Sequence, residues 1–412
     1  MQAHVLETLD PTVIGVRLTE ARKARGLTQQ QVADELGVAR TTLTAMEAGE
    51  RRPRAAELVQ LATLYGRNLG ELVRAARKPP TADLVVQFRT ARTPAGSERD
   101  AALDGDIQVF QQLCADFLEL EELLSAPLLR RYPEVYDMRG SEPERAAEDV
   151  ALSERNRLGL GDGPIGDLWS ILENDVGLRV FAPAFASPRL AGLFAFSEAL
   201  GGCIAVNGKH PEERRRMTAA HEYGHFLADR YRAEITVVWS YRRVPESERF
   251  AEAFALNFLA PAAGLARRFE ALKRARADNK ATPADILQLC HVYRMSFQAM
   301  TLRLESLKLL ASGSWDRLKG RIKPQAARVL LDLPPVYPEH AALPFRYEQL
   351  AVRAYARELL SEGRLARMLR TDRLGARRRV EELGVAQFFD ERDGEIKQLA
   401  LDLDAALVSG RA

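Results

Sequence analysis

The sequence MTAAHEYGHFLADRY, residues 217–231, places two histidines and a glutamate in the spacing H-E-x-x-H. Positions i and i+4 lie on one face of a helix, so His221 and His225 can bind one metal ion while Glu222 lies beside the open coordination position. This arrangement is typical of zinc hydrolases. Acidic residues before the motif and apolar residues after it favour a helix. The alternative is a pair of ordinary histidines on an amphipathic helix.

A third metal ligand is expected elsewhere in the chain, because a hydrolytic zinc site keeps three protein ligands and one water. The segment PESERFAEAFALNFLAP, residues 245–261, has an apolar helical face with Glu248 and Glu252 one turn apart beside it. We expect Glu248 to bind the metal and Glu252 to support a ligand imidazole through a hydrogen bond. The reverse assignment stays open because the sequence does not fix the rotation of this helix, and either carboxylate could instead lie on a solvated face.

These residues predict a hydrolytic Zn²⁺ site. Zinc held by two imidazoles and one carboxylate lowers the pKa of its water toward about 7 and polarises a carbonyl group. Glu222 is the expected general base. Stabilising the oxyanion needs a further donor, for which the candidates are His210, Tyr241, Arg242 and His291. Each of these four is individually more consistent with a structural or solvated role.

Length and composition are typical of a globular protein with several domains and exclude a single small module. The chain has 412 residues, of which 46% are hydrophobic and 28% charged, with a formal net charge of +2. This size suits two to four domains. We expect a cytoplasmic protein without a membrane partner, because no long apolar run and no N-terminal signal pattern occur. Cys114, Cys203 and Cys290 lack metal-site or secreted spacing and predict buried free thiols.

The N-terminal segment, residues 13–76, predicts five short helices. Gly26 ends the first, Thr28 caps TQQQVADEL, and Gly37-Val38 forms a turn before ARTTLTAMEAG. This order of helix, turn and helix resembles the repressor-type (XRE/Cro) helix-turn-helix family, through V-A-x-x-L-G-V at 32–38 and M-E-x-G-x-R-x-P at 46–53.

The resemblance implies binding to double-stranded DNA, with the second helix of the pair in the major groove. By position, the residues expected to contact DNA through the two helices are Gln29, Arg40, Thr41, Thr42 and Thr44. The expected phosphate contacts in the following loop are Arg51, Arg52 and Arg54. The alternatives are a solvated basic loop and a protein-docking domain.

The region around H-E-x-x-H is similar to the ImmA/IrrE-type zinc metallopeptidases. The matches are R-x-T-A-A-H-E-Y-G-H at 216–225, I-A-V-N at 204–207 and E-R-x-A-x-x-F-A-x-x-x-L-x-P at 248–261. This resemblance implies a zinc endopeptidase that cleaves helix-turn-helix repressors. Glu252 departs from the usual Asn or Asp of that family and Ala260 from the usual Met, and a longer Glu252 side chain could itself reach the metal.

We expect a multidomain, mainly α fold with four segments. Residues 1–78 form an all-α helix-turn-helix domain and 79–143 a linker with an amphipathic helix. Residues 144–318 form an α+β zincin-like metallopeptidase core with a small sheet from LRVFA, LAGLFAF and GGCIAVN, and 319–412 a helical C-terminal domain. The apolar seam of the amphipathic helix, from Ile107 to Leu124, predicts either packing on a neighbouring domain or a homodimer.

The C-terminal segment begins with a basic, proline-bearing stretch, 319–345, that predicts an extended connector. The following LPFRYEQLAVRAYARELLSEGRLARML resembles a tail of longer members of the metallopeptidase family. The stretch SEGRLARMLRTDRLGARRRVEEL, 361–383, has the layout of a second helix-turn-helix. A scaffold or oligomerisation role is the preferred interpretation because the turn signature is weak.

Together the patterns predict a DNA-binding transcription regulator fused to a zinc-dependent endopeptidase that cleaves a repressor in a stress or phage-related response. The alternative is a non-proteolytic regulator that uses the peptidase fold as a metal-dependent sensor or switch.

Overall fold

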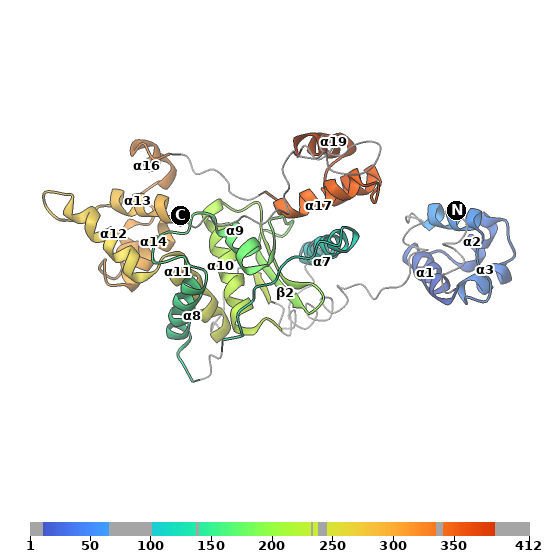
Figure 1. The fold of residues 1–412 in the computed structure, drawn as a ribbon, viewed down its shortest axis with the longest axis horizontal. Coiled ribbons are helices and arrows are strands. Elements are labelled where there is room, and N and C mark those ends of the chain that lie inside the picture. The colour runs from blue at the N-terminus through green and yellow to red at the C-terminus, as the bar shows by residue number, and fades with distance from the viewer. Residues whose placement is uncertain are drawn as a thin grey trace, which may run out of the picture. The chain divides into compact units, whose positions relative to one another are not determined.

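The computed structural model describes residues 11–65, 101–136, 140–231, 234–237, 245–334 and 341–383. The chain divides into two compact units, Met1–Pro80 and Thr81–Ala412 (Figure 1). The described residues are mostly helical, and the second unit contains one small sheet. This composition confirms the predicted multidomain, mainly α fold class.

The first unit is a helical bundle. Its described helices are α1 (Pro11–Ala24), α2 (Gln29–Leu36), α3 (Arg40–Glu47) and α4 (Ala55–Tyr65). Thr28 caps α2, because its hydroxyl accepts the backbone N–H of Gln31 while the Gln31 side chain accepts the backbone N–H of Thr28. Gly37 ends α2 in the left-handed conformation with a φ of 68°. The fifth predicted helix falls within 66–76, outside the described residues.

The second unit is built around a four-stranded sheet in the order β1-β3-β2-β4. The strands are β1 (Arg179–Phe181), β2 (Leu190–Ser197), β3 (Gly201–Val206) and β4 (Glu234–Val237). Strand β1 pairs with β3 in parallel, and β2 pairs with β3 and β4 antiparallel. The three predicted strands are confirmed. Strand β4 was not predicted, although its sequence EITV is rich in β-branched residues.

Both faces of the sheet are covered by helices, so β2 and β3 are buried along their whole length. Side chains alternate between two cores, as the two-residue period of a strand requires. Phe194 and Ile204 belong to one core, and Leu193 and Cys203 to the other.

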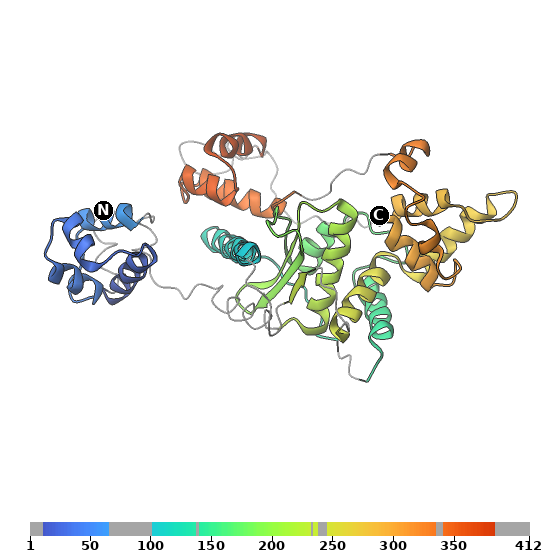
Figure 2. The ribbon, with the colours of Figure 1, turned by 180° about the vertical axis from the view of Figure 1, so that it is seen from behind.

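The first of these cores lies between the sheet and the helix that carries H-E-x-x-H. That helix is α10 (Glu212–Asp229), which packs against β2 and β3, and Figure 2 shows the strands running beside it. Helix α11 (Glu246–Leu259) packs between α10 and α8 (Pro143–Arg157). A short α9 (Leu168–Ser170) continues into a π-helical turn, η1 (Ile171–Val176), before β1.

The second core lies between the other face of the sheet and the amphipathic helix α7 (Ala101–Leu123). The seam of α7 is buried there, at Ile107, Phe110, Leu113, Phe117 and Leu120, and Leu124 continues it just beyond the helix. Of the two predicted roles for this seam, packing within the chain is therefore the one observed. Its apolar residues are not available for a homodimer.

The remaining described helices follow α11 in the sequence. They are α12 (Ala262–Arg274), α13 (Pro283–Tyr293), α14 (Phe297–Ser306), α15 (Ser314–Leu318), α16 (Pro324–Leu330), α17 (Phe345–Ala356), α18 (Glu362–Met368) and α19 (Arg373–Glu382). The prediction of an extended connector over 319–345 was wrong where α16 forms. Pro324 is at the start of α16, where its missing N–H costs nothing, so this proline begins a helix.

The three cysteines are free and buried, as predicted. Among the helices of the described ranges, none combines the length and apolar character needed to cross a lipid bilayer.

Candidate metal centre

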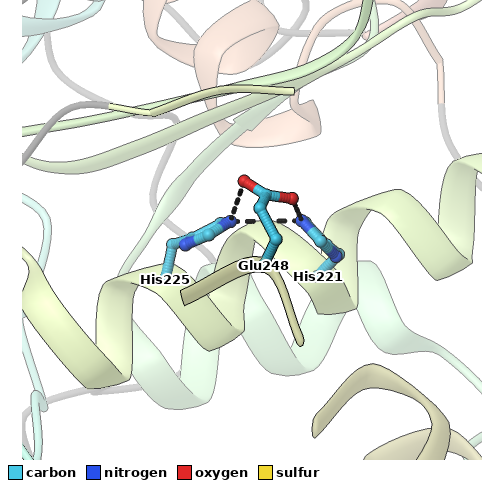
Figure 3. Close-up of side chains that lie close together, drawn as sticks. All are labelled: His221, His225 and Glu248. Carbon is cyan, nitrogen blue, oxygen red and sulfur yellow. Dashed lines mark hydrogen bonds and ion pairs between the residues drawn. The ribbon is translucent and has the colours of Figure 1, made fainter. Parts of the chain in front are cut away.

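The two histidines of H-E-x-x-H and Glu248 converge at one point (Figure 3). The Nε2 atoms of His221 and His225, one turn apart on α10, lie 3.1 Å from each other. Glu248 comes from the first turn of α11 and reaches both rings, with Oε2 3.3 Å from His221 Nε2 and Oε1 3.5 Å from His225 Nε2. One ligand atom from each of the three residues lies within 4.8 Å of the other two, so the group could hold a metal ion.

The charge of Glu248 is compatible with this role. Burial by itself raises the pKa of a carboxyl group, but the hydrogen bonds from His221 and His225 outweigh it and hold the pKa of Glu248 well below its ordinary value. An ionised carboxylate facing two imidazoles is the donor set that Zn²⁺ binds in hydrolytic sites. The residues present therefore fit zinc.

Glu222 lies against the sheet and has no solvent-exposed surface. Gly192 of β2 makes this approach possible, because a Cβ atom there would lie 2.3 Å from Glu222 Oε1 and 2.7 Å from Thr218 Cγ2. A glycine in the interior of a strand often marks such a close approach. The sequence did not single out Gly192, and a glycine within the apolar run LAGLFAF was the available signal.

A buried polar network anchors α10 to α8. The carboxylate of Glu154 on α8 accepts hydrogen bonds from the hydroxyl of Tyr223 at 2.5 Å and from that of Tyr136 at 2.9 Å. Arg157 Nη2 donates to the same carboxylate at 2.7 Å. Tyr223 lies inside the metal motif, between Glu222 and Gly224, so the network fixes the helix that carries the histidines. The sequence did not reveal these partners, because Glu154 and Tyr223 are far apart along the chain.

Glu252 is exposed and does not belong to the group of side chains that could hold a metal ion. It follows Glu248 by one turn of α11, about 6 Å further along the helix axis. The structure therefore brings together Glu248 and the histidines and places Glu252 outside the cluster.

The four predicted oxyanion donors are not assigned by the structure. His210 and His291 lie outside the group formed by His221, His225 and Glu248. Burial and the nearby charge of Arg214 lower the pKa of His210, which favours its neutral form. Tyr241 and Arg242 fall outside the described residues.

The predicted DNA contacts of α3 form a solvent-facing surface. Arg40, Thr41 and Thr44 are exposed and Thr42 is half-buried, while Leu43 is buried on the opposite side. The hydroxyl of Thr44 donates to the backbone carbonyl of Arg40 at 3.0 Å.

Two other predicted contacts already have partners within the domain. Gln29 Nε2 donates to Glu47 Oε2 at 2.8 Å, and Arg51 Nη2 donates to Glu57 Oε1 at 2.8 Å. Arg52 and Arg54 are exposed beside them. The surface of α3 and the exposed arginines of the loop are thus the accessible part of the predicted DNA interface.

Fold and site together define a helix-turn-helix domain joined to a unit that resembles a zinc peptidase. Residues 18–72 match the family model for the helix-turn-helix, and residues 173–305 match the model for the IrrE N-terminal-like domain. The chain thus combines a helix-turn-helix DNA-binding regulator domain with an IrrE-like peptidase domain.

The similarity to one curated protein covers a small part of this chain. The HTH-type transcriptional regulator AnsR from Bacillus subtilis is 36% identical over 74 residues, which are 18% of this chain and 64% of AnsR. The match therefore spans less than two thirds of that relative. A crystal structure of ComR from Streptococcus suis aligns with 92% of this chain and 90% of ComR at 13% identity, with a TM-score of 0.15.

Proposed function

We propose that this chain is a DNA-binding regulator whose second unit is a zinc-dependent endopeptidase. The observation that carries the proposal is the convergence of His221, His225 and Glu248 within 4.8 Å, with Glu222 next to His221 on the same helix. The match of residues 173–305 to the IrrE N-terminal-like domain supports the same reading.

In the proposed reaction, His221, His225 and Glu248 hold zinc. The bound ion would supply Lewis-acid polarisation of a peptide carbonyl and activation of water. Glu222 accepts a proton from the attacking water and returns it to the leaving amine. An extended substrate segment could add to the sheet at its edge strand β4, which follows the metal helix in the sequence.

The proposed substrate is a helix-turn-helix repressor, either a separate protein or this chain itself. Support comes from the DNA-binding domain on the same chain, which would bring the peptidase to operators where repressors bind. Such a regulator would act in the cytoplasm. A homodimer would suit a protein that binds the two half-sites of a DNA operator.

A Glu222→Gln variant tests the proposal. We expect it to retain zinc and to lose cleavage by about 100- to 10,000-fold, because the amide cannot act as general base. Glu252→Gln is the matched control: it makes the same substitution at an exposed position of α11 and should cleave like the wild type. The measurement compares new protein N-termini in cells that express each variant, together with the zinc content of the purified proteins.

Two outcomes would contradict the proposal. If Glu222→Gln cleaves as fast as the wild type, Glu222 is not the general base. If the wild type binds zinc and no cellular protein is cleaved under stress or on phage induction, a metal-dependent sensor without turnover is the better account.

A further inference from the structure

A second segment of the chain repeats the backbone plan of the N-terminal helix-turn-helix. In the first, a hydroxyl residue caps α2, a left-handed residue ends the helix and α3 begins after one more cap position. In the second, Ser361 caps α18, Arg370 is left-handed with a φ of 54°, and Asp372 caps α19. The spacing from cap to left-handed residue to cap is identical in the two segments, 28–37–39 and 361–370–372.

The hydrogen bonds of the two turns also correspond. In each, the left-handed residue donates its N–H to the carbonyl three residues earlier, and the following residue donates to the carbonyl five residues earlier. The pairs are Gly37 to Asp34 at 3.2 Å, Val38 to Ala33 at 3.0 Å, Arg370 to Arg367 at 3.2 Å and Thr371 to Ala366 at 3.0 Å. The hydrogen bonds that end the first helix of each pair are thus the same.

A supporting helix precedes the pair in both segments. Helix α1 buries Ile14, Leu18 and Ala21, and α17 buries Tyr347, Ala351 and Ala354 at the same spacing. An ion pair between Arg379 and Glu348 joins α19 to α17. The second segment therefore has three consecutive helices in the same order as α1, α2 and α3.

The outer face of α19 corresponds to the DNA-reading face of α3. In α3 the first, second and fifth residues are exposed and the fourth is buried. In α19, Arg373, Leu374 and Arg377 are exposed at those positions, Ala376 is buried at the fourth, and Arg378 is exposed beside them. The side chains that reach base edges and phosphates in such units come from this face.

The turn alone does not define a DNA reader, as α13 and α14 demonstrate. Arg294 is left-handed there with a φ of 51°, and Met295 donates its N–H to the carbonyl of Cys290 at 3.1 Å. However, α14 begins with Phe297, which is 6% exposed, and Thr301 at its fifth position is fully buried. The corresponding face of that helix lies in the core, whereas the face of α19 is in solvent.

The charge of the second segment suits a polyanion. Residues 361–383 contain the basic residues Arg364, Arg367, Arg370, Arg373, Arg377, Arg378 and Arg379 and the acidic residues Glu362, Asp372, Glu381 and Glu382. Arg377 pairs with Glu362 at 2.7 Å, whereas Arg373 and Arg378 are exposed arginines of α19. Leu374 is the one large apolar side chain exposed among the described residues of α19. Such a face favours the DNA backbone over an apolar protein surface.

We propose that α17, α18 and α19 form a second helix-turn-helix that binds double-stranded DNA. Helix α19 enters the major groove, and Arg373 and Arg378 contact phosphates. The chain then has two DNA-binding surfaces, one in each compact unit. This inference does not depend on the peptidase activity.

The test uses the full-length chain and a random-sequence DNA duplex, in a background in which Arg40→Ala and Arg52→Ala weaken the first reader. Into this background we introduce Arg373→Ala and Arg378→Ala. We expect weaker binding and a drop of about 2 in the slope of log affinity against log salt, since each lost phosphate contact removes about 0.9. Binding is measured by fluorescence anisotropy over a series of salt concentrations.

The matched control is Lys280→Ala with Arg321→Ala, which removes the same charge from exposed positions outside the segment. It should leave the slope within error of the background protein. Thermal melting and zinc content establish that each variant is folded. The proposal is overturned if the Arg373 and Arg378 variant binds like the background protein, or if the control lowers the slope equally.

Discussion

At the scale of single residues, the contact between Gly192 and Glu222 leaves no room for a methyl group. We expect Gly192→Ala to displace the Glu222 carboxylate, because the new Cβ would lie 2.3 Å from Glu222 Oε1. The overpacking should lower the free energy of unfolding by about 1–3 kcal/mol. Zinc content should stay unchanged, since the atoms nearest the new Cβ belong to Glu222 and Thr218, neither of which is a proposed metal ligand. Thermal melting measures the change in stability, zinc analysis measures the metal content, and the cleavage assay measures the effect of displacing Glu222.

Gly166→Ala provides the control for that substitution. Gly166 is exposed, its φ is not in the left-handed region, and a Cβ atom there would meet nothing within 4 Å. This variant should match the wild type in stability and cleavage. Equal cleavage by Gly192→Ala and wild type would mean that the buried position of Glu222 is unimportant for the reaction.

The choice between the two carboxylates of α11 leads to a second prediction. Glu248→Ala should lower zinc affinity by about 100-fold or more, because the third donor is lost from a site of two imidazoles. Glu252→Ala should bind zinc like the wild type, since that residue is exposed and outside the cluster. Competition with a chromogenic chelator measures both affinities. A weaker affinity in the Glu252 variant alone would reverse the assignment.

At the scale of elements, the start of α13 depends on an ionised side chain. Burial opposes the charge of Asp285, but hydrogen bonds from Arg276 and from Thr282 outweigh it and lower the pKa of Asp285 below its ordinary value. A carboxyl group whose pKa is lowered by folding stabilises the protein above its unfolded pKa of about 4. The contribution is lost as pH falls through the lower pKa of the folded state.

Asp285→Asn should therefore reduce the free energy of unfolding by about 1 kcal/mol at pH 7. The difference from the wild type should shrink as pH falls below about 4, because Asn resembles the protonated acid. Urea unfolding at a series of pH values measures it. Asp278→Asn, at an exposed acid in the preceding loop, is the control and should change stability little. A gap between Asp285→Asn and the wild type that is independent of pH would exclude the charge as its cause.

Local patterns predicted those elements whose period is visible in the sequence. The spacing of His221 and His225 fixed the metal face of α10, and the short apolar runs gave three of the four strands. The rotation of α11 and the hydrogen-bond network at Glu154 depend on contacts between segments that are far apart in the sequence. The periodicity of one segment does not predict such contacts. The second helix-turn-helix had a weak signature because Arg370 is left-handed where such turns usually have glycine or asparagine.

At the scale of the whole molecule, helices of the second unit pack on both faces of its sheet. The metal helix and its partners cover one face, and α7 with residues of α17, α18 and α19 shares a core with the other. Arg364 of α18 also pairs with Glu119 of α7. The predicted segments 79–143 and 319–412 thus contribute to the core behind the sheet that carries the site. Substitutions at the buried residues of α17, α18 and α19 should therefore lower the stability of the whole second unit.

The division at Pro80 predicts that the two units unfold separately and that zinc stabilises only one of them. A ligand that binds only the folded state adds about 2.7 kcal/mol at 100 times its dissociation constant. In calorimetry of the full chain, zinc should raise the unfolding temperature of the unit Thr81–Ala412 and leave that of Met1–Pro80 unchanged. Duplex DNA, which both proposed DNA-binding surfaces bind, should raise both unfolding temperatures in the wild type. With Arg373→Ala and Arg378→Ala, DNA should raise only the unfolding temperature of Met1–Pro80. A single transition that moves as one with zinc would contradict the independence of the two units.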